Sequence, residues 1–241
     1  MSLKNKNIFV TGANRGIGQS LVAEALKRGA KRVYAGTRQP LAHSDERVTP
    51  VNLDVTNAAQ IQDAVKRVES LDILINNAGL AIYDDLNDRA VLELHLAVNF
   101  FGTYGVTQAF LPMLAGSRGA IVNMLSVASL AALPVIPAYS ISKAAAFSMT
   151  QSLRALLAGR GVSVHAVLTG PVDTDMSRGL EIPKASPQSV AQGIFDGVNK
   201  GEEDIFPDPM SASMAPSWRG GAVKAVEHQF ASLVGGEPVA S

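Results

Sequence analysis

The 241-residue sequence lacks cysteine, which excludes a disulfide framework, thiol catalysis and iron–sulfur chemistry. It also has no net charge, since 21 basic residues balance 21 acidic ones, and this argues against nucleic acid as a partner. One uncharged stretch, 119–142, contains prolines and polar residues that a lipid-facing helix tolerates poorly, so we expect no membrane span. The absence of cysteine fits a reducing compartment, and we expect a cytoplasmic protein.

Strand and helix patterns alternate along the chain from its start. Short apolar runs predict six strands, at residues 7–11, 32–36, 48–51, 71–75, 120–125 and 162–168. Helices are expected at 16–28, 58–68, 90–114, 138–158, 189–198 and 218–233, with a short extended piece at 204–206. The helix 90–114 should bend near Gly102 or Gly105, and 208–216 should be a surface loop. Strands separated by helices predict a single α/β domain over residues 1–241, a Rossmann-type, doubly wound parallel sheet with helices on both faces.

A glycine-rich loop, residues 11–18, joins the first predicted strand to the first predicted helix. Its glycines are spaced G-x3-G-x-G, at Gly12, Gly16 and Gly18. Such a loop lets a pyrophosphate approach the backbone, and the helix N-terminus then offers free N–H groups to it. The spacing differs from the common G-x-G-x-x-G fingerprint, and a tight strand–helix turn is the alternative interpretation.

The end of the second strand indicates which dinucleotide would bind. An acidic residue there would hold a ribose 2′-hydroxyl and repel a 2′-phosphate. This chain has no acid at that point, whereas Arg38 can bind a phosphate and Arg15 supplies a second cation nearby. The pair predicts NADP(H), and two ordinary surface arginines are the alternative.

Tyr139 and Lys143 stand four residues apart at the start of a predicted helix, so they share one of its faces. A nearby ammonium should lower the pKa of the phenol, which would let this pair move a proton to or from an alcohol or ketone oxygen. Ser126 follows the fifth strand, at the edge of the sheet where open α/β folds bind ligands. Its hydroxyl can bond the same substrate oxygen.

With these residues the sequence resembles the short-chain dehydrogenase/reductase family. The matching pieces follow the family's order and cover about residues 5–176: the loop 11–18, Asp54-Val55, the Asn-Asn-Ala-Gly run 76–79, Asn99, Ser126, Tyr139 with Lys143, and 170–174. One departure is Thr169-Gly170-Pro171 where the family often has Pro-Gly.

The resemblance implies roles for individual residues. Tyr139 would be the catalytic acid/base, Lys143 its activator and a ligand of the nicotinamide ribose, Ser126 the group that polarises the carbonyl, and Asn99 the anchor of a water chain. The implied cofactor-binding residues are Gly12, Asn14, Arg15, Gly16, Ile17, Gly18, Arg38, Asp54, Val55, Asn76, Ala78, Gly79, Tyr139, Lys143, Val172 and Thr174. The cofactor half would be about 5–118, and the catalytic and substrate half about 119–241.

The expected function is NADPH-dependent reduction of a ketone or aldehyde, reversible as an alcohol dehydrogenase. The apolar segment 130–137 favours a hydrophobic small-molecule carbonyl, and the short segment 176–186 stands where the family carries its substrate lid. Alternatives are a 3-oxoacyl or steroid-type reductase of the same family, or a catalytically silent NADP-binding sensor. The helix 144–157 is apolar nearly all round and family dimers use this helix, so we expect a homodimer or larger homo-oligomer.

Other polar residues point to ordinary structural roles. The four histidines have no ligand spacing, so no metal site is expected. His95 and Asn99 lie four residues apart on a predicted helix, which indicates packing for His95 more than chemistry. The neighbouring carboxylates Asp84 and Asp85 are expected to be solvated loop residues.

Overall fold

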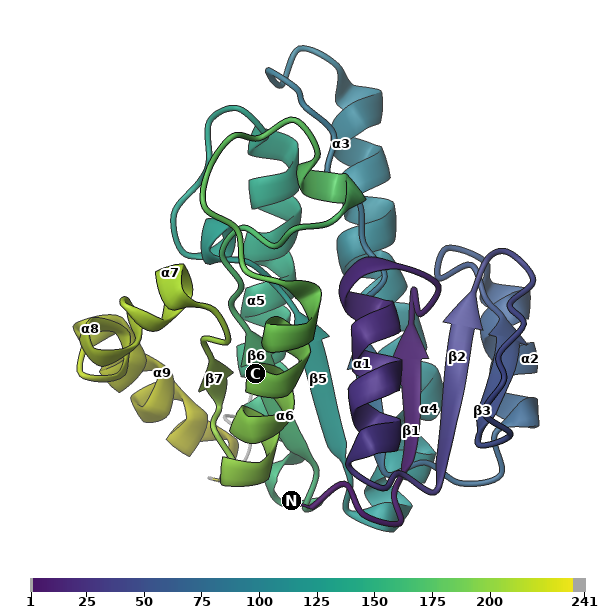
Figure 1. The fold of residues 1–241 in the computed structure, drawn as a ribbon. Coiled ribbons are helices and arrows are strands. Elements are labelled where there is room, and N and C mark those ends of the chain that lie inside the picture. Colours follow the sequence, from purple (N-terminus) through teal and green to yellow (C-terminus); the bar gives the residue numbers. More distant parts are fainter. Residues whose placement is uncertain (1, 236–241) are drawn as a thin grey trace.

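Most strands are short apolar segments buried on both faces, as parallel strands covered by helices must be, whereas the edge strand Val48–Asn52 is partly exposed. The strands are β1 (Asn7–Thr11), β2 (Arg32–Thr37), β3 (Val48–Asn52), β4 (Ile73–Asn76), β5 (Ala120–Met124), β6 (Ser163–Val167) and β7 (Asp204–Ile205). The computed structural model describes residues 2–235, and its strands pair in parallel in the order β3-β2-β1-β4-β5-β6-β7 (Figure 1). The predicted Rossmann-type fold is confirmed, and the piece expected at 204–206 forms a seventh strand.

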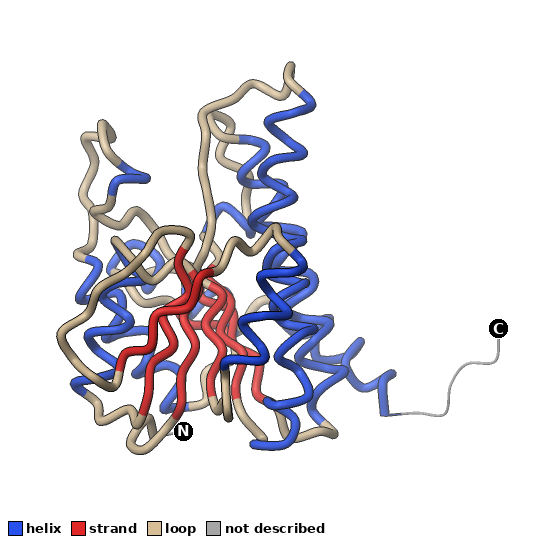
Figure 2. The backbone as a smooth tube through the Cα atoms, turned by 90° about the vertical axis from the view of Figure 1, so that its right-hand side faces the viewer, coloured by secondary structure: helices blue, strands red, loops and turns tan. Residues whose placement is uncertain are grey.

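Alternate residues of the strands face two separate layers of helices. The layers contain α1 (Gly16–Lys27), α2 (Ala58–Arg67), α4 (Thr103–Ser117), α5 (Pro137–Ala158) and α6 (Pro187–Lys200). Ile8 and Val10 of β1 pack with α1 and α6, whereas Phe9 between them packs with α2, α4 and α5. Figure 2 shows the sheet between these layers, with loops gathered beyond the carboxyl ends of the strands. A site built from those loops therefore rests on a rigid base.

The helix expected at 90–114 is three consecutive segments: α3 (Arg89–His95), a π-helical turn η1 (Leu96–Gly102) and α4. Wide π-type turns that end at Gly102 thus interrupt the α-helix where a bend was expected. A Cβ at Gly102 would lie 2.7 Å from the Val55 side chain, so the glycine allows the helix to lie close to the segment after β3. π-helical turns occur frequently at functional sites, and this one contains Asn99.

The C-terminal part differs most from expectation. Residues 208–216, expected as a surface loop, contain α7 (Pro209–Ala212) and the start of α8 (Ala215–Arg219), and the helix expected at 218–233 is divided between α8 and α9 (Ala222–Ala231). The fully buried residue Ser211 shows that this is no loose loop. Within residues 2–235, no helix is both long and apolar enough to cross a membrane.

Buried ion pairs hold α9 against α5 and β7. Lys224 of α9 lies 2.8 Å from a carboxylate oxygen of Asp204 and 2.9 Å from one of Glu227. Arg154 of α5 pairs with the same two carboxylates. Since Lys224, Asp204 and Glu227 are almost fully buried, this cluster fixes the C-terminal helices to the body of the fold.

Candidate functional site

The glycine loop after β1 has the backbone conformation that its glycines allow. Gly12 and Gly16 have φ values of +66° and +55°, and a Cβ at Gly18 would lie 2.1 Å from the Gly12 carbonyl oxygen. Arg15, which precedes α1, does not cap this helix with its side chain. The first N–H groups of α1 are thus available to an anion at the positive end of the helix dipole. This geometry fits a dinucleotide pyrophosphate.

The segment after β4 lies directly against this loop. The buried Thr11 hydroxyl accepts hydrogen bonds of 2.9 Å from the N–H groups of Asn77 and Ala78. The Asn77 side chain donates to the carbonyl oxygens of Thr11 and Gly12. Asn76 points the other way, because its buried amide bonds Thr107 and Asn123 inside the fold. Any cofactor contact of Asn76 therefore falls to its backbone.

Ser126, Tyr139 and Lys143 come together at the carboxyl end of the sheet. The Ser126 side chain hydrogen-bonds to the Tyr139 phenol, and Lys143 Nζ lies 5.7 Å from the centre of the Tyr139 ring. The ammonium donates a 2.7 Å hydrogen bond to the carbonyl oxygen of Met124, at the end of β5. Tyr139 and Lys143 are both buried, with 9% and 6% of their surfaces exposed. Tyr139 and Lys143 are thus largely shielded from bulk water, whereas Ser126 is half-buried.

Burial changes the pKa values of both residues. Desolvation raises the pKa of the Tyr139 phenol above its usual value, and the hydrogen bond with Ser126 opposes this only in part. Burial also lowers the pKa of Lys143 to about 8. The expectation that Lys143 lowers the pKa of Tyr139 is wrong for the protein alone, because the cost of burying a phenolate is the larger effect. Near neutral pH Tyr139 is a neutral acid.

Asn99 links this trio to the segment after β4. Its side-chain oxygen accepts from the N–H of Leu80, and its amide nitrogen donates to the carbonyl of Leu80 and to Ser142, each at 2.9 Å. The Ser142 hydroxyl in turn donates to the carbonyl oxygen of Tyr139. The side chain of Asn99 therefore holds two pieces of the site together.

The two arginines predicted to bind a phosphate differ in their surroundings. Arg38 follows β2, is exposed, and forms no ion pair within the described residues. Arg15 pairs at 3.0 Å with Asp175, whose carboxylate also pairs with Arg178. Of the two arginines, only Arg15 is thus already held in an ion pair with a carboxylate among residues 2–235.

Asp54 and Val55 lie at the neighbouring strand end. The carboxylate of Asp54 accepts from the backbone N–H and the hydroxyl of Thr56, which lowers its pKa below the usual value, and Arg38 adds to this effect. Val55 is buried against Gly102. Both residues are therefore firmly placed beside the ends of β2 and β3.

The turn after β6, Thr169-Gly170-Pro171, completes the site, and close packing explains the glycine in it. A Cβ at Gly170 would lie 2.7 Å from an oxygen of Asp208, so a side chain would not fit. Asp208 accepts a 2.8 Å hydrogen bond from the Gly170 N–H, and the Thr169 carbonyl accepts from the Ser126 hydroxyl at 3.3 Å. Asp208 thus fixes the turn on which Ser126 rests.

Val172 and Thr174 follow that turn. The buried Val172 is held through its carbonyl oxygen, which accepts a 2.6 Å hydrogen bond from the Ser177 hydroxyl. Thr174 lies against the glycine loop, because a Cβ at Gly16 would be 3.2 Å from its methyl group. The segment after β6 therefore closes over the loop after β1.

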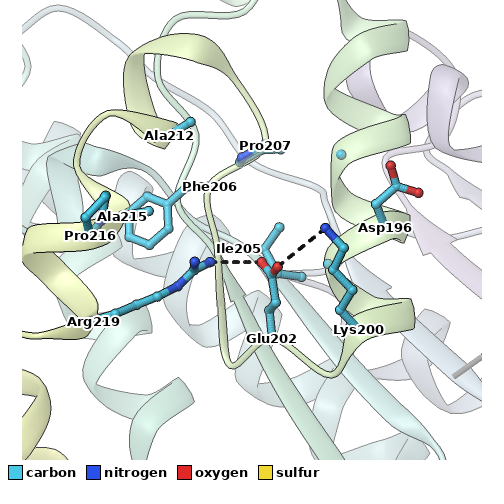
Figure 3. Close-up of a pocket in the computed structure, with 12 residues that line it drawn as sticks. Asp196, Lys200, Glu202, Ile205, Phe206, Pro207, Ala212, Ala215, Pro216 and Arg219 are labelled. Carbon is cyan, nitrogen blue, oxygen red and sulfur yellow. Dashed lines mark hydrogen bonds and ion pairs between the residues drawn. The ribbon is translucent and has the colours of Figure 1, made fainter.

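A separate pocket of about 380 Å³ lies at the far side of β7. Residues of α6, α7, α8 and the segment around β7 line this pocket. In it, Glu202 forms ion pairs with Lys200 and Arg219 (Figure 3). None of the predicted site residues lines it. Over residues 2–235, no group of three or more His, Asp or Glu side chains is placed to hold a metal ion.

The geometry of this site agrees with relationships to known proteins. The model of the short chain dehydrogenase family matches residues 6–184. The chain belongs to the short-chain dehydrogenase/reductase family. It is 36% identical over 208 residues to 2-(S)-hydroxypropyl-CoM dehydrogenase 3 of Xanthobacter autotrophicus, covering 80% of this chain and 82% of that protein. The protein is therefore an oxidoreductase with the CH–OH and C=O chemistry of its family.

Solved structures show the same relationship. A short chain dehydrogenase from Burkholderia cenocepacia, crystallised in complex with NADP, superposes with a TM-score of 0.87 at 36% identity, covering 95% of this chain and 98% of that one. ElxO with NADP bound superposes with a TM-score of 0.76 at 24% identity, covering 87% and 99%, and shares the fold.

Three residues of the site lay outside the expectations from sequence. His95, expected only to pack, lies edge-on to the Tyr139 ring, with 6.4 Å between ring centres. Asp84, expected to be solvated, accepts from the N–H of Ala138 at the start of α5. Asp208 caps α7 in a capping box with Ser211. Of these three roles, only that of Asp208 could have been predicted from sequence, since Asp-Pro-x-Ser at 208–211 is a typical helix start.

Proposed function

We propose that this chain is an NADPH-dependent carbonyl reductase that acts on a hydrophobic ketone or aldehyde and works in reverse as an alcohol dehydrogenase. The observation that carries the proposal is the placement of the half-buried Ser126 beside the buried Tyr139 and Lys143, next to a glycine loop that fits a pyrophosphate. The NADP-bound Burkholderia relative supports the same cofactor here.

The cofactor site follows from the loops at the carboxyl end of the sheet. The glycine loop and the first turn of α1 would hold the pyrophosphate, Arg38 and Arg15 the 2′-phosphate, and Asp54 the adenine side. The segments 76–79 and 172–174 would lie along the nicotinamide half. When bound, NADPH supplies a hydride to the carbonyl carbon.

The residues of this chain supply the proton and the orientation. Tyr139 donates its phenolic proton to the carbonyl oxygen as the carbon receives the hydride, and Ser126 hydrogen-bonds to the same oxygen. Lys143 holds a positive charge beside the phenolate that Tyr139 becomes, and it would also hold the ribose of a bound nicotinamide cofactor. Asn99 anchors the water chain that returns a proton to Tyr139 through Lys143.

The raised pKa of Tyr139 supports reduction as the favoured direction near neutral pH. A neutral phenol is ready to donate a proton, whereas alcohol oxidation needs the phenolate. We therefore expect reduction to dominate near pH 7 and oxidation to gain as the pH rises.

Apolar side chains around the site support a hydrophobic substrate. Loops at the carboxyl end of the sheet contribute the exposed side chains Ile82, Tyr83, Leu86, Leu133, Val135, Met176, Ile182 and Met210. Such a rim offers apolar contact to an aryl or alkyl group attached to the carbonyl. We assign cofactor binding chiefly to residues 5–118, and catalysis and substrate binding chiefly to 119–241.

We also propose a homodimer or larger homo-oligomer in the cytoplasm. Large apolar side chains are exposed on the η1–α4 helix, at Phe101 and Tyr104, and on the adjacent α5, at Ile141 and Leu156. A second copy would bury them. Sedimentation at micromolar concentration tests this, and a monomer would contradict it.

Loss of NADPH absorbance with a panel of ketones, 3-oxoacyl thioesters and steroid ketones, run in parallel with NADH, tests the reaction. We expect turnover of hydrophobic ketones with a preference for NADPH. Tyr139→Phe should lower kcat by at least about 100-fold while NADPH binding persists. The exposed Tyr104→Phe is the matched control. NADPH binding without turnover of any compound would favour a silent sensor.

A further inference from the structure

The segment after β4, residues 79–86, runs alongside the catalytic residues from one end to the other. At its start, a Cβ at Gly79 would lie 3.5 Å from Lys143 Nζ. Near its end, both carboxylate oxygens of Asp84 lie 3.3 Å from the backbone nitrogen of Ala138, the residue before Tyr139. This segment, which we call the 79–86 segment, is therefore one side of the space in front of Tyr139.

Two side chains one helical turn apart bind the backbone of this segment. Asn99 bonds both backbone groups of Leu80, and Nε2 of His95 lies 3.1 Å from the backbone nitrogen of Ile82. His95 ends α3 and Asn99 lies in the π-helical turn η1 that follows it. Both side chains therefore reach the segment from the same continuous helix.

The partners of His95 determine the tautomer of its ring. Nδ1 lies 2.8 Å from the carbonyl oxygen of Val91, which only accepts, so Nδ1 carries the proton. Nε2 faces the N–H of Ile82, which only donates, so Nε2 carries a lone pair. The ring is fully buried, and its two partners fit the tautomer with the proton on Nδ1.

We propose that His95 is a positioning residue for the reaction: its Nε2 holds Ile82 and thereby fixes the 79–86 segment as the substrate-facing wall beside Tyr139. This inference rests on the proposed function. Ile82 and Tyr83 expose 39% and 61% of their surfaces on this wall, where they contact the apolar part of the carbonyl compound. The His95 ring also packs edge-on against the Tyr139 ring. One side chain therefore sets the distance between the 79–86 segment and the Tyr139 phenol.

The test compares two replacements that keep different halves of the imidazole. His95→Gln keeps an acceptor near the Nε2 position, whereas His95→Asn keeps a donor near Nδ1 and loses the acceptor. We expect His95→Asn to raise KM for the ketone about tenfold with kcat and NADPH affinity changed less than about threefold. We expect His95→Gln to restore KM to near the wild-type value. The exposed His43→Asn is the control.

An equal rise in KM for the ketone in His95→Asn and His95→Gln would assign His95 a packing role only and overturn the proposal. So would a lowered kcat with an unchanged KM. If His95→Asn does not fold, Asp84→Ala removes the other anchor of the segment from a half-buried position, and the same rise in KM is expected.

Hydrogen exchange tests the anchor without any turnover, so failure of the proposed function would not hide the result. The Ile82 amide should be protected in the wild-type protein and in His95→Gln, and should exchange about tenfold faster in His95→Asn. A fast-exchanging Ile82 amide in the wild-type protein, or equal protection in all variants, would overturn the assignment of His95.

Discussion

Replacing Arg38 by aspartate should change the choice between the two nicotinamide cofactors. Arg38 stands at the carboxyl end of β2 with an exposed side chain and no ion pair among the described residues. The positive charge of Arg38 already helps to lower the pKa of Asp54, which follows β3. The substitution Arg38→Asp removes a cation from the place of the 2′-phosphate and puts a like charge there.

The size of the effect follows from the interactions lost. Hydrogen bonds to a charged group contribute about 1.5–3 kcal/mol. Repulsion between carboxylate and phosphate adds about 1 kcal/mol at a solvated distance near 4 Å. A total of about 3 kcal/mol corresponds to NADPH binding roughly 150-fold weaker. NADH has no 2′-phosphate, so its affinity should change less than about threefold.

Arg15 should matter less than Arg38, because it is already paired. Its ion pair with Asp175 is exposed on both sides, and such pairs contribute about 0–1 kcal/mol. The free energy that Arg15 gains by binding a phosphate is thus partly offset by the loss of its ion pair with Asp175. We expect Arg15→Ala to weaken NADPH about tenfold and Asp175→Asn to tighten it by less than about fivefold.

Fluorescence titration with NADPH and NADH at two salt concentrations measures these changes, since surface charge is screened within about 10 Å at 0.1 M. Arg32→Asp is the matched control, because Arg32 is an exposed arginine at the opposite end of the same strand. Equal losses for NADPH and NADH in Arg38→Asp, or no loss for either, would refute phosphate recognition by Arg38.

Three further results are expected. Because the pKa of Lys143 is about 8 in the protein alone, kcat/KM for NADPH should fall as the pH rises through about 8, and a flat profile to pH 9.5 would contradict its role. Lys224→Met should lower the free energy of unfolding by about 3 kcal/mol, because three carboxylates lose one of their cationic partners. The stability that comes from the lowered pKa of Glu203, about 2, is present above pH 4.5 and is lost as the pH falls toward 2. Gly170→Ala should lower kcat/KM at least about tenfold by displacing the turn under Ser126, whereas Gly116→Ala, with open space around it, should not.

Much of the fold could be predicted because its signals are local. The strand β1 begins and ends where expected, and helices α1, α2 and α5 differ by one residue at most at either end. Apolar runs, helical periodicity and glycine placement are properties of neighbouring residues. The errors lie where a local pattern allows several outcomes, as in the π-helical turn between α3 and α4 and in the division of the last helix at Gly220 and Gly221.

The candidate site shows the same division. The sequence predicted that Tyr139 and Lys143 share a helix face, and that Ser126 ends a strand at the edge where ligands bind. The pKa of Tyr139 could not be predicted, because it depends on how deeply the phenol is buried once the loops have closed around it. The position of His95 was expected, but not its partners.

By itself, the sequence determined the order of strands and helices, the glycine loop, the absence of an acid after β2, and the spacing of Tyr139 and Lys143. These are set by covalent neighbours and by the repeat of a helix or strand. The tertiary structure alone decided that Asp208 supports the turn after β6, that Asp84 caps α5, and that His95 holds Ile82 in a single tautomer. The first two contacts join residues far apart in the chain, and all three depend on the packing of segments that no local pattern encodes.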